Sequence, residues 1–421
     1  MKKIFTNCLL ILIAAFLFSS CTKDKCTHTY TFYLPVYKTK EEVRANIKSN
    51  SPRQVERPGK LFILGKYIFL NEIDRGIHII DNTNPSGPVN VAFIDIPGNI
   101  DLAVKGNTLY ADAYSDLVTL DITNPTQVSV KKFVDKAFPP RIYSNGFVSD
   151  SNRIIVDWIR KDTTVTIDCE RGERFLWGGG CPTCAFAVDA SSGGGKSTGS
   201  PFGAGIGGSM ARFTIMNNYL YAVTNYSLNV FNISQPQDPQ FSNTVTLGWN
   251  IETIYPFKDR LFIGSTTGMF IYSTQDPAAP AKLGEFIHVN SCDPVVADDK
   301  YAYVTLRSGN NCGGFTNQLD VVNIENLNIP MLAKTYQLTN PHGLSKDGTL
   351  LFVCDGKDGL KIYNAADPLD LKLLQHIKNV ETYDVIAHNK VALVVAKDGL
   401  YQFGYDNLDN IKLLSKIGYK Y

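Results

Sequence analysis

A six-residue phrase recurs along the chain at a spacing of about forty residues. Its clearest copy, residues 120–125, reads Leu-Asp-Ile-Thr-Asn-Pro, and similar copies end at Pro85, Pro236, Pro277 and Pro368. The interval is 40 residues from Pro85 to Pro125 and 41 from Pro236 to Pro277. A fixed period of this length indicates one supersecondary unit repeated many times, because a single unit cannot bury its own faces.

Each unit is predicted to contain four short strands. In the unit that closes at Pro125, β-branched and aromatic runs at 101–104, 108–113, 117–122 and 128–134 are separated by Gly, Asn, Asp and Pro. Four short antiparallel strands in every forty residues are typical of a β-propeller blade. The chain is therefore predicted to be an all-β propeller.

The number of blades follows from the copies of the second strand. Eight copies can be aligned, at residues 67–69, 108–110, 153–155, 219–221, 260–262, 301–303, 350–352 and 390–393. The third copy is the weakest, and its closing segment 164–168 has no proline. We therefore predict eight blades, with seven as the alternative if the third copy pairs differently.

Two segments interrupt the period. The interval from Asp168 to Asn232 is 64 residues, with a charged stretch followed by glycine-dense sequence near 173–208, and residues 308–318 add a second insertion. Insertions in repeat proteins form loops on one face, often the face that binds ligands.

The first twenty residues have the pattern of a secretory signal. Lys2 and Lys3 precede an apolar run that is too short to span a bilayer. The run ends in Ser19-Ser20-Cys21, which resembles a bacterial lipoprotein signal with Cys21 as the lipidated residue, although Phe18 departs from the usual pattern. Thr22 after the cysteine favours the outer membrane, and which side the protein faces stays open. An ordinary signal peptide is the alternative.

The segment 21–58 precedes the propeller, which is expected to occupy residues 59–421. Residues 30–36 are expected to form a strand that helps to close the ring. The spacing of Thr39 and Glu42 matches a capping box, and Val43 and Ile47 lie one helical turn apart, so a short helix is expected next.

The charge of the chain excludes some partners. Without Lys2 and Lys3, the 41 Lys and Arg residues fall to 39, against 40 Asp and Glu. Nucleic-acid binding needs a positively charged surface, and this balance argues against it.

The repeated phrase, with the Gly-Asn-x-Leu-Tyr run before it, resembles the LVIVD repeat family. The resemblance covers most of residues 59–418, and it is degenerate in the third unit and lacks the proline in the sixth. It implies an exported bacterial or archaeal β-propeller. It implies no particular activity, because fold alone does not determine function.

Two motifs in the first insertion suggest chemistry at first sight. Residues 190–197 fit a relaxed phosphate-loop pattern, but the sequence that follows is a poor helix start, so a nucleotide site is rejected. Cys181 and Cys184 form one CxxC pair, which is half a zinc site at most. Disulfides are the preferred interpretation in an oxidising compartment: Cys292 with Cys312, and Cys169 with Cys181 or Cys184. Cys354 is expected to be a buried free thiol.

The residues at the starts of the innermost strands are the candidate ligand site. Counting back from each second strand gives Lys60, Asp101, Arg212, Glu252, Asp293, His342 and either Tyr383 or Asp384. In a propeller these positions ring one mouth of the central channel, where they could bind a cation or a polar ligand. The competing interpretation is structural: each side chain bonds to backbone of the adjoining blade. No metal site, cofactor or catalytic residue is predicted.

These observations favour a non-catalytic binding or scaffolding protein of the cell envelope, with a protein or glycan ligand on the face that carries the insertions. A metal-assisted hydrolase or lyase and a purely structural envelope protein are the alternatives. His342 is the first histidine to test, since no histidine shows paired metal-ligand spacing.

Overall fold

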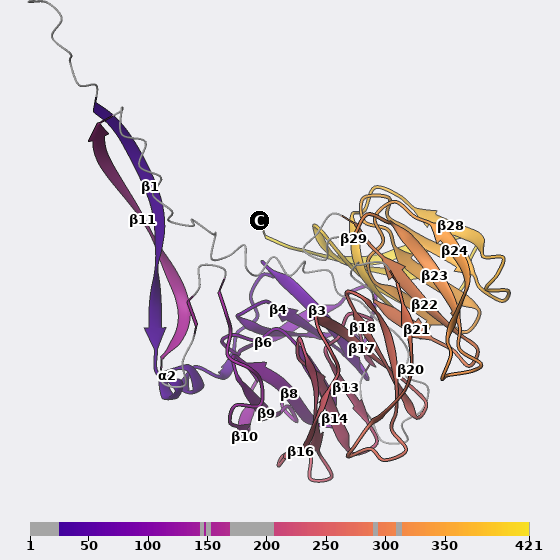
Figure 1. Cartoon of the computed structure of the whole chain (residues 1–421), viewed down its shortest axis with the longest axis horizontal. Coiled ribbons are helices and arrows are strands. Elements are labelled where there is room, and N and C mark those ends of the chain that lie inside the picture. Colours follow the sequence, from indigo (N-terminus) through magenta and orange to yellow (C-terminus); the bar gives the residue numbers. More distant parts are fainter. Residues whose placement is uncertain are drawn as a thin grey trace, which may run out of the picture. The chain divides into compact units, whose positions relative to one another are not determined.

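The structure is a computed structural model that describes residues 25–143, 147–148, 153–168, 206–288, 294–308 and 314–420. These residues fall into two compact units, a small one built on two strands and a large one that contains the repeats. Figure 1 shows the elements of both. Each unit is described by itself.

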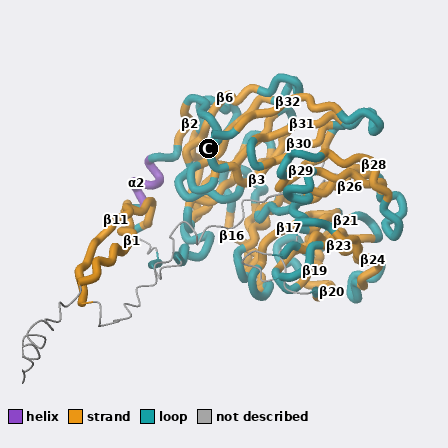
Figure 2. Tube along the Cα trace, turned by 90° about the horizontal axis from the view of Figure 1, so that it is seen from above, coloured by secondary structure: helices purple, strands orange, loops and turns teal. Residues whose placement is uncertain are grey.

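The large unit is a β-propeller of seven blades (Figure 2). Each blade is built on four antiparallel strands that follow one another along the chain. The seven-blade alternative is therefore confirmed, and the prediction of eight is wrong. The strands of the first three blades are β3 (Pro58–Leu64), β4 (Tyr67–Glu72), β5 (Gly76–Asp81) and β6 (Val89–Asp95); β7 (Leu102–Lys105), β8 (Thr108–Ala113), β9 (Asp116–Asp121) and β10 (Ser129–Val134); and β13 (Phe213–Met216), β14 (Tyr219–Val223), β15 (Ser227–Asn232) and β16 (Gln240–Thr246).

The other four blades follow without interruption of this order. Their strands are β17 (Ile251–Phe257), β18 (Arg260–Ser265), β19 (Gly268–Ser273) and β20 (Ala281–Ile287); β21 (Val295–Ala297), β22 (Tyr301–Leu306), β23 (Gln318–Asn323) and β24 (Met331–Gln337); β25 (Leu344–Asp347), β26 (Leu350–Cys354), β27 (Leu360–Asn364) and β28 (Lys372–Ile377); and β29 (Thr382–His388), β30 (Val391–Ala396), β31 (Gly399–Gly404) and β32 (Lys412–Gly418).

The third predicted copy is the origin of the miscount. Residues 153–155 lie at the start of β11 (Ile154–Asp168), a single strand of 15 residues that pairs with β1 (Lys25–Lys38) and with no blade. The expectation that residues 30–36 help to close the ring is wrong for the same reason. The pair β1–β11 forms the small unit, where Thr31 Oγ1 donates to Asp162 Oδ1 at 2.6 Å.

The N-terminal segment also contributes to the large unit. The predicted helix is confirmed as α2 (Lys40–Ala45), with Thr39 and Glu42 forming the expected capping box and Val43 buried. Strand β2 (Lys48–Asn50) then adds to the outer strand of blade 1, and β12 (Ile206–Gly207) adds to its inner strand. Among the described residues, no helix is long and apolar enough to cross a membrane.

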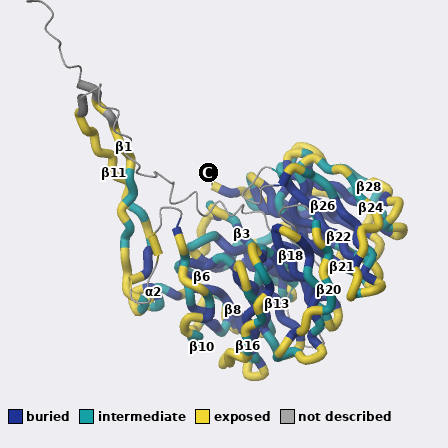
Figure 3. The backbone as a smooth tube through the Cα atoms, viewed as in Figure 1, coloured by how far each residue is buried: buried dark blue, intermediate teal, exposed yellow. Residues whose placement is uncertain are grey.

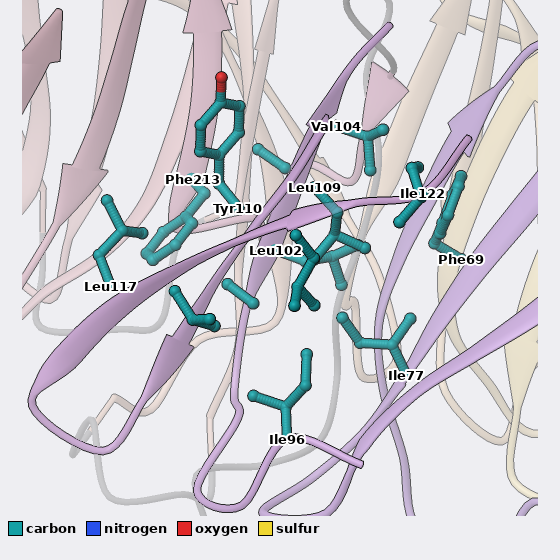
Figure 4. Close-up of a cluster of buried hydrophobic side chains, with 14 of the residues drawn as sticks. Phe69, Ile77, Ile96, Leu102, Val104, Leu109, Tyr110, Leu117, Ile122 and Phe213 are labelled. Atoms are coloured by element: carbon teal, nitrogen blue, oxygen red, sulfur yellow. The ribbon is translucent and has the colours of Figure 1, made fainter. Parts of the chain in front are cut away.

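Blade-to-blade packing forms the core. The first three strands of each blade are almost wholly buried, whereas the outer strands and the turns are exposed (Figure 3). Phe69 and Ile77 of blade 1, Leu109 of blade 2 and Phe213 of blade 3 belong to one buried cluster (Figure 4). The inner strands of each blade are therefore buried on both faces by the two neighbouring blades.

The ring closes between blades 7 and 1 without sharing a strand. Leu393 and Val395 of blade 7 pack with Ile68 and Leu70 of blade 1. Gln402 Nε2 also donates to Asn82 Oδ1 at 2.6 Å. Side-chain packing and these amide bonds therefore hold the first blade to the last.

Candidate functional site

The two faces of the propeller differ in regularity. We call the face on which the innermost strand of each blade begins the upper face, and the face on which it ends the lower face. In an antiparallel four-stranded blade, the connection between blades and the turn between the second and third strands lie on the upper face. The two interruptions of the period lie between β10 and β13 and between β22 and β23, so the described strands on either side of each interruption end or begin on the upper face.

The lower face contains the repeated phrase, which forms two consecutive side-chain turns. In blade 2, Asp121 Oδ1 accepts the N–H of Thr123, and Asn124 Oδ1 accepts the N–H of Thr126. The Thr123 hydroxyl and amide lower the pKa of Asp121 to about 2. The same two-residue bond recurs from Asp81, Asn232, Ser273, Asn323 and Asn364. The phrase is therefore a turn-forming device.

The proline of the phrase also joins neighbouring blades. Tyr110 of blade 2 donates its hydroxyl to the carbonyl of Pro236 in blade 3, and Tyr221 of blade 3 does so to Pro277 in blade 4. Tyr336 and Pro368 repeat the bond between blades 5 and 6. These residues hold the ring together.

On the upper face, the structure brings five of the predicted site residues together around the channel. Lys60, Asp101, Arg212, Glu252 and Asp384 lie within electrostatic range of one another. Asp101 is 2% exposed and accepts the backbone N–H of Leu102 at 2.7 Å and that of Arg212 in the next blade. This is the blade-to-blade bond that the structural interpretation expects.

Burial dominates the electrostatics of this cluster. It raises the pKa of Asp101 to about 6, although Lys60 and the two backbone N–H groups oppose the shift. It also lowers the pKa of Lys60 and of Arg212, because the charged form of each is desolvated. Since two cations lie among the three acids, the described cluster is already close to charge balance.

His342 lies beside Arg307, and its ring packs against that of Tyr383 with centroids 5.3 Å apart. Arg307 Nη1 is 3.0 Å from His342 Nδ1, and both side chains are buried. Burial, and then the charge of Arg307, lower the pKa of His342 to about 2, so the imidazole is neutral at physiological pH. A neutral imidazole facing a guanidinium is a hydrogen-bond acceptor with a fixed role.

The centre of the channel is crossed by residues 206–211, and residues 206–208 belong to the predicted first insertion. Met210 O accepts Lys60 Nζ of blade 1 at 2.6 Å, and Ala211 O accepts the N–H of Ile254 in blade 4 at 2.9 Å. Ser209 Oγ accepts the N–H of Leu344 in blade 6 at 3.3 Å. Because these three blades lie around the ring, the segment must pass through its middle.

This crossing segment is closely packed. Ser209, Met210 and Ala211 are all buried, and a Cβ at Gly207 would lie 3.1 Å from the ring of Phe62. The channel centre is thus filled by the chain itself, which leaves the rim of the upper face as the accessible part.

A cavity of ≈ 710 Å³ lies between blades 2 and 3, where the chain leaves the repeat. Phe138 and Phe241 line it, and Phe138 stacks on Phe213 with ring centroids 5.4 Å apart. Arg141 also lines the cavity, but it donates to Asp74 Oδ1 and Gly98 O. Arg141 therefore fixes the segment that follows the last strand of blade 2 to residues of blade 1 and its connection.

An exposed aromatic pair on the rim was missed by the sequence reasoning. Tyr226 lies in the turn between β14 and β15, and Trp249 lies in the connection from β16 to β17. Their centroids are 5.1 Å apart and their planes are at 87°. The sequence does contain a signal for this pair. Trp249 is a large apolar residue in a connection between blades, where no residue of the core is expected.

The remaining predicted residues divide into two groups. Cys354 is a buried free thiol, as predicted. Asp293 and the cysteines assigned to lipidation or disulfides lie outside the described residues, namely Cys21, Cys169, Cys181, Cys184, Cys292 and Cys312. Within the described part of the chain, no group of three or more His, Cys, Asp or Glu side chains could hold a metal ion.

Comparison with known proteins agrees with this architecture. Solved structures that are similar include a protein from Lactobacillus plantarum, 12% identical with a TM-score of 0.54, over 86% of this chain and 96% of that one. The periplasmic gluconolactonase PpgL of Pseudomonas aeruginosa is 13% identical with a TM-score of 0.51, again over 86% and 96%. At these identities the likeness shows the fold alone.

No curated protein matches the sequence. Residues 59–95 and 99–136, which contain blades 1 and 2, match the LVIVD repeat. The remaining blades repeat the same turns and bulges; for example, the outer strand of blade 7 has a bulge between Leu413 and Ser415, at the place where that of blade 1 has one between Asn90 and Ala92. The chain is therefore a seven-bladed β-propeller whose first two blades match the LVIVD repeat.

Proposed function

We propose that this protein is a non-catalytic binding or scaffolding propeller of the bacterial cell envelope, with a protein or glycan ligand on its upper face. One observation carries the proposal: both interruptions of the seven-fold repeat are flanked by strand ends on that face. Loops placed by a rigid scaffold are where binding residues are most often found.

The use of the ring's polar residues supports this assignment. Turn residues of the lower face bond to their own backbone, and the tyrosines bond to the prolines of the next blade. At the centre of the upper face, Asp101 holds the next blade and Lys60 holds the crossing segment. The rim and the insertions are left to bind a partner.

The alternatives are weaker on the same grounds. A metal-assisted hydrolase or lyase would need a set of ligands for the cation, and the described acids of the upper face are interspersed with Lys60 and Arg212. A purely structural envelope protein would not need breaks confined to one face. Metal analysis of the purified protein tests the first alternative.

The ligand-binding proposal is tested by deleting residues 193–204, which keeps the crossing segment 206–211 intact. Intact and deleted proteins would be used to capture partners from solubilised envelopes of the source bacterium, with thermal unfolding as the check on folding. We expect the deletion to lose a partner that the intact protein retains. Identical partners for the two folded proteins would contradict the role of this insertion.

We also propose that a lipid on Cys21 anchors the protein in the outer membrane. The support is the signal-like sequence of residues 1–21, and two or more acyl chains would hold a protein there stably. Cys21→Ala should release the protein from the membrane fraction and abolish the acyl mass on the N-terminal peptide. An unmodified Cys21 in the mature protein would contradict the anchor.

A further inference from the structure

We infer that Tyr226 and Trp249 form a carbohydrate-binding corner on the rim of the upper face. The inference rests on the proposed binding function and assigns the ligand class as a glycan with pyranose rings. The two side chains are 46% and 75% exposed, so both rings are accessible to a ligand.

The shape of the pair suits a sugar ring. With ring planes at 87° and centroids 5.1 Å apart, one ring presents its face and the other an edge, so that together they make a right-angled corner. A pyranose has apolar C–H groups on its faces and hydroxyl groups around its edge. It can therefore stack on an aromatic face while its hydroxyls reach polar neighbours.

The corner is held in place before any ligand binds. Tyr226 O accepts the N–H of Leu247 at 2.9 Å, which ties the turn that carries Tyr226 to the connection that carries Trp249. Thr224 Oγ1 accepts the N–H groups of Tyr226 and Ser227 at 3.2 and 3.0 Å. Two loops joined in this way lose little freedom on binding.

Polar groups border the corner on the side of the channel. Asn225 Oδ1 accepts Arg212 Nη2 at 3.0 Å, and Asn225 O accepts the N–H of Ile251, which precedes Glu252. The Nε of Arg212 is buried and has no hydrogen-bond partner. An amide and a guanidinium beside an aromatic pair provide donors and acceptors that sugar hydroxyls need.

The surroundings favour a glycan over a protein. A stable protein interface buries about 800 Å² on each partner around an apolar centre. Here the neighbours of the two rings in sequence are Thr224, Asn225, Ser227, Gly248 and Asn250. Two aromatic rings set in a polar surface are too small an apolar centre for such an interface, but they match the size of one or two sugar rings.

The test uses the full mature protein on an array of mono- to hexasaccharides that contain hexoses, N-acetylhexosamines and uronic acids. Hits would be measured by titration calorimetry. We expect Trp249→Ala and Tyr226→Ala each to weaken binding at least tenfold, and Trp249→Phe to keep part of the affinity. Phe315→Ala is the matched control, because Phe315 is 97% exposed and lies on the same face without an aromatic partner among the described residues.

The outcomes separate this inference from the proposed function. If the intact protein binds no saccharide but captures an envelope protein through the upper face, the glycan assignment is overturned and the binding function stands. If a saccharide binds equally well to the folded Trp249→Ala and Tyr226→Ala proteins, the corner is overturned as its site. If neither saccharide nor envelope partner binds, both proposals fall.

Discussion

The lower face of this propeller repeats one turn around the ring, whereas the upper face differs from blade to blade. On the lower face, the residue after each third strand bonds to the turn between the first two strands, as Asn82 does to Lys66 and Tyr405 does to Lys390. On the upper face, Asp101, Arg212 and Glu252 lie at or next to the starts of neighbouring inner strands, and the connections vary in length. On the lower face the same bond is repeated from blade to blade, whereas on the upper face the bonds that hold the ring, such as that from Arg212 N–H to Asp101, differ from blade to blade.

The first prediction concerns the close contact of two blades near the lower face and has the largest expected effect. A Cβ at position 284 would lie 2.1 Å from Leu327 O of the next blade, and backbone cannot easily move there. We expect Gly284→Ala to lower the free energy of unfolding by about 3 kcal/mol, measured by urea titration.

Gly87→Ala is its control, because the added Cβ would meet only Asn84 Nδ2 at 3.4 Å. A change of about 0.5 kcal/mol or less is expected there. Equal stability of the two variants would show that this blade junction can relax, and the rigid character assigned to the lower face would have to be given up.

The second prediction concerns Asp101 at the centre of the upper face. Its pKa in the folded protein is about 6, above the ordinary value of 3.8, so the folded state binds the proton more tightly than the unfolded state. The contribution of Asp101 to stability is therefore greatest below about pH 4 and falls as the pH rises to about 6, by up to about 3 kcal/mol. Asp101→Asn should remove this part of the pH dependence between pH 4 and 7.

Asp121→Asn on the lower face provides the comparison. The pKa of Asp121 is lowered to about 2, so this carboxylate titrates below the window and its replacement should leave the slope from pH 4 to 7 unchanged. If Asp101→Asn and Asp121→Asn gave the same pH profile as the parent protein, Asp101 would not be a buried group with a raised pKa.

The third prediction concerns single bonds between blades. Burial raises the pKa of Tyr110 and of Tyr221, and each hydroxyl donates to a proline carbonyl at 2.7 and 2.8 Å respectively. Tyr110→Phe and Tyr221→Phe should each lower the free energy of unfolding by about 1 kcal/mol. Tyr226→Phe, at an exposed position, should cause no change. A loss as large for Tyr226→Phe would indicate an effect unrelated to the blade junctions.

The sequence predicts the ring because the four strands of a blade are neighbours in the sequence. The strands of the unit closing at Pro125 lie within one or two residues of their expected bounds. Local pattern also placed Asp101, Arg212 and Glu252 at one channel mouth. The prediction that the third copy forms a blade is wrong because a β-branched run such as 153–155 indicates a strand but not its partner. The strand that forms, β11, pairs with β1, more than a hundred residues away. Nothing local reveals such a partner.

The same limit applies to the centre of the site. The bonds of Ser209 and Met210 join residues that are 135 and 150 positions apart, and no periodicity marks them. The Tyr226–Trp249 pair depends on two loops meeting on the rim, which a count of repeats cannot show. The proposed binding residues of this propeller are therefore those that the repeat does not predict.

The crossing segment also changes how the ring should come apart. In a repeat protein whose units touch only their neighbours, unfolding can start at any unit and spread step by step. Residues 206–211 connect blades 1, 4 and 6 at once, so that opening one of these blades breaks bonds shared with the other two. Blades 1, 4 and 6 therefore share one point of attachment, and hydrogen exchange of their inner strands should report one cooperative unit instead of three separate ones.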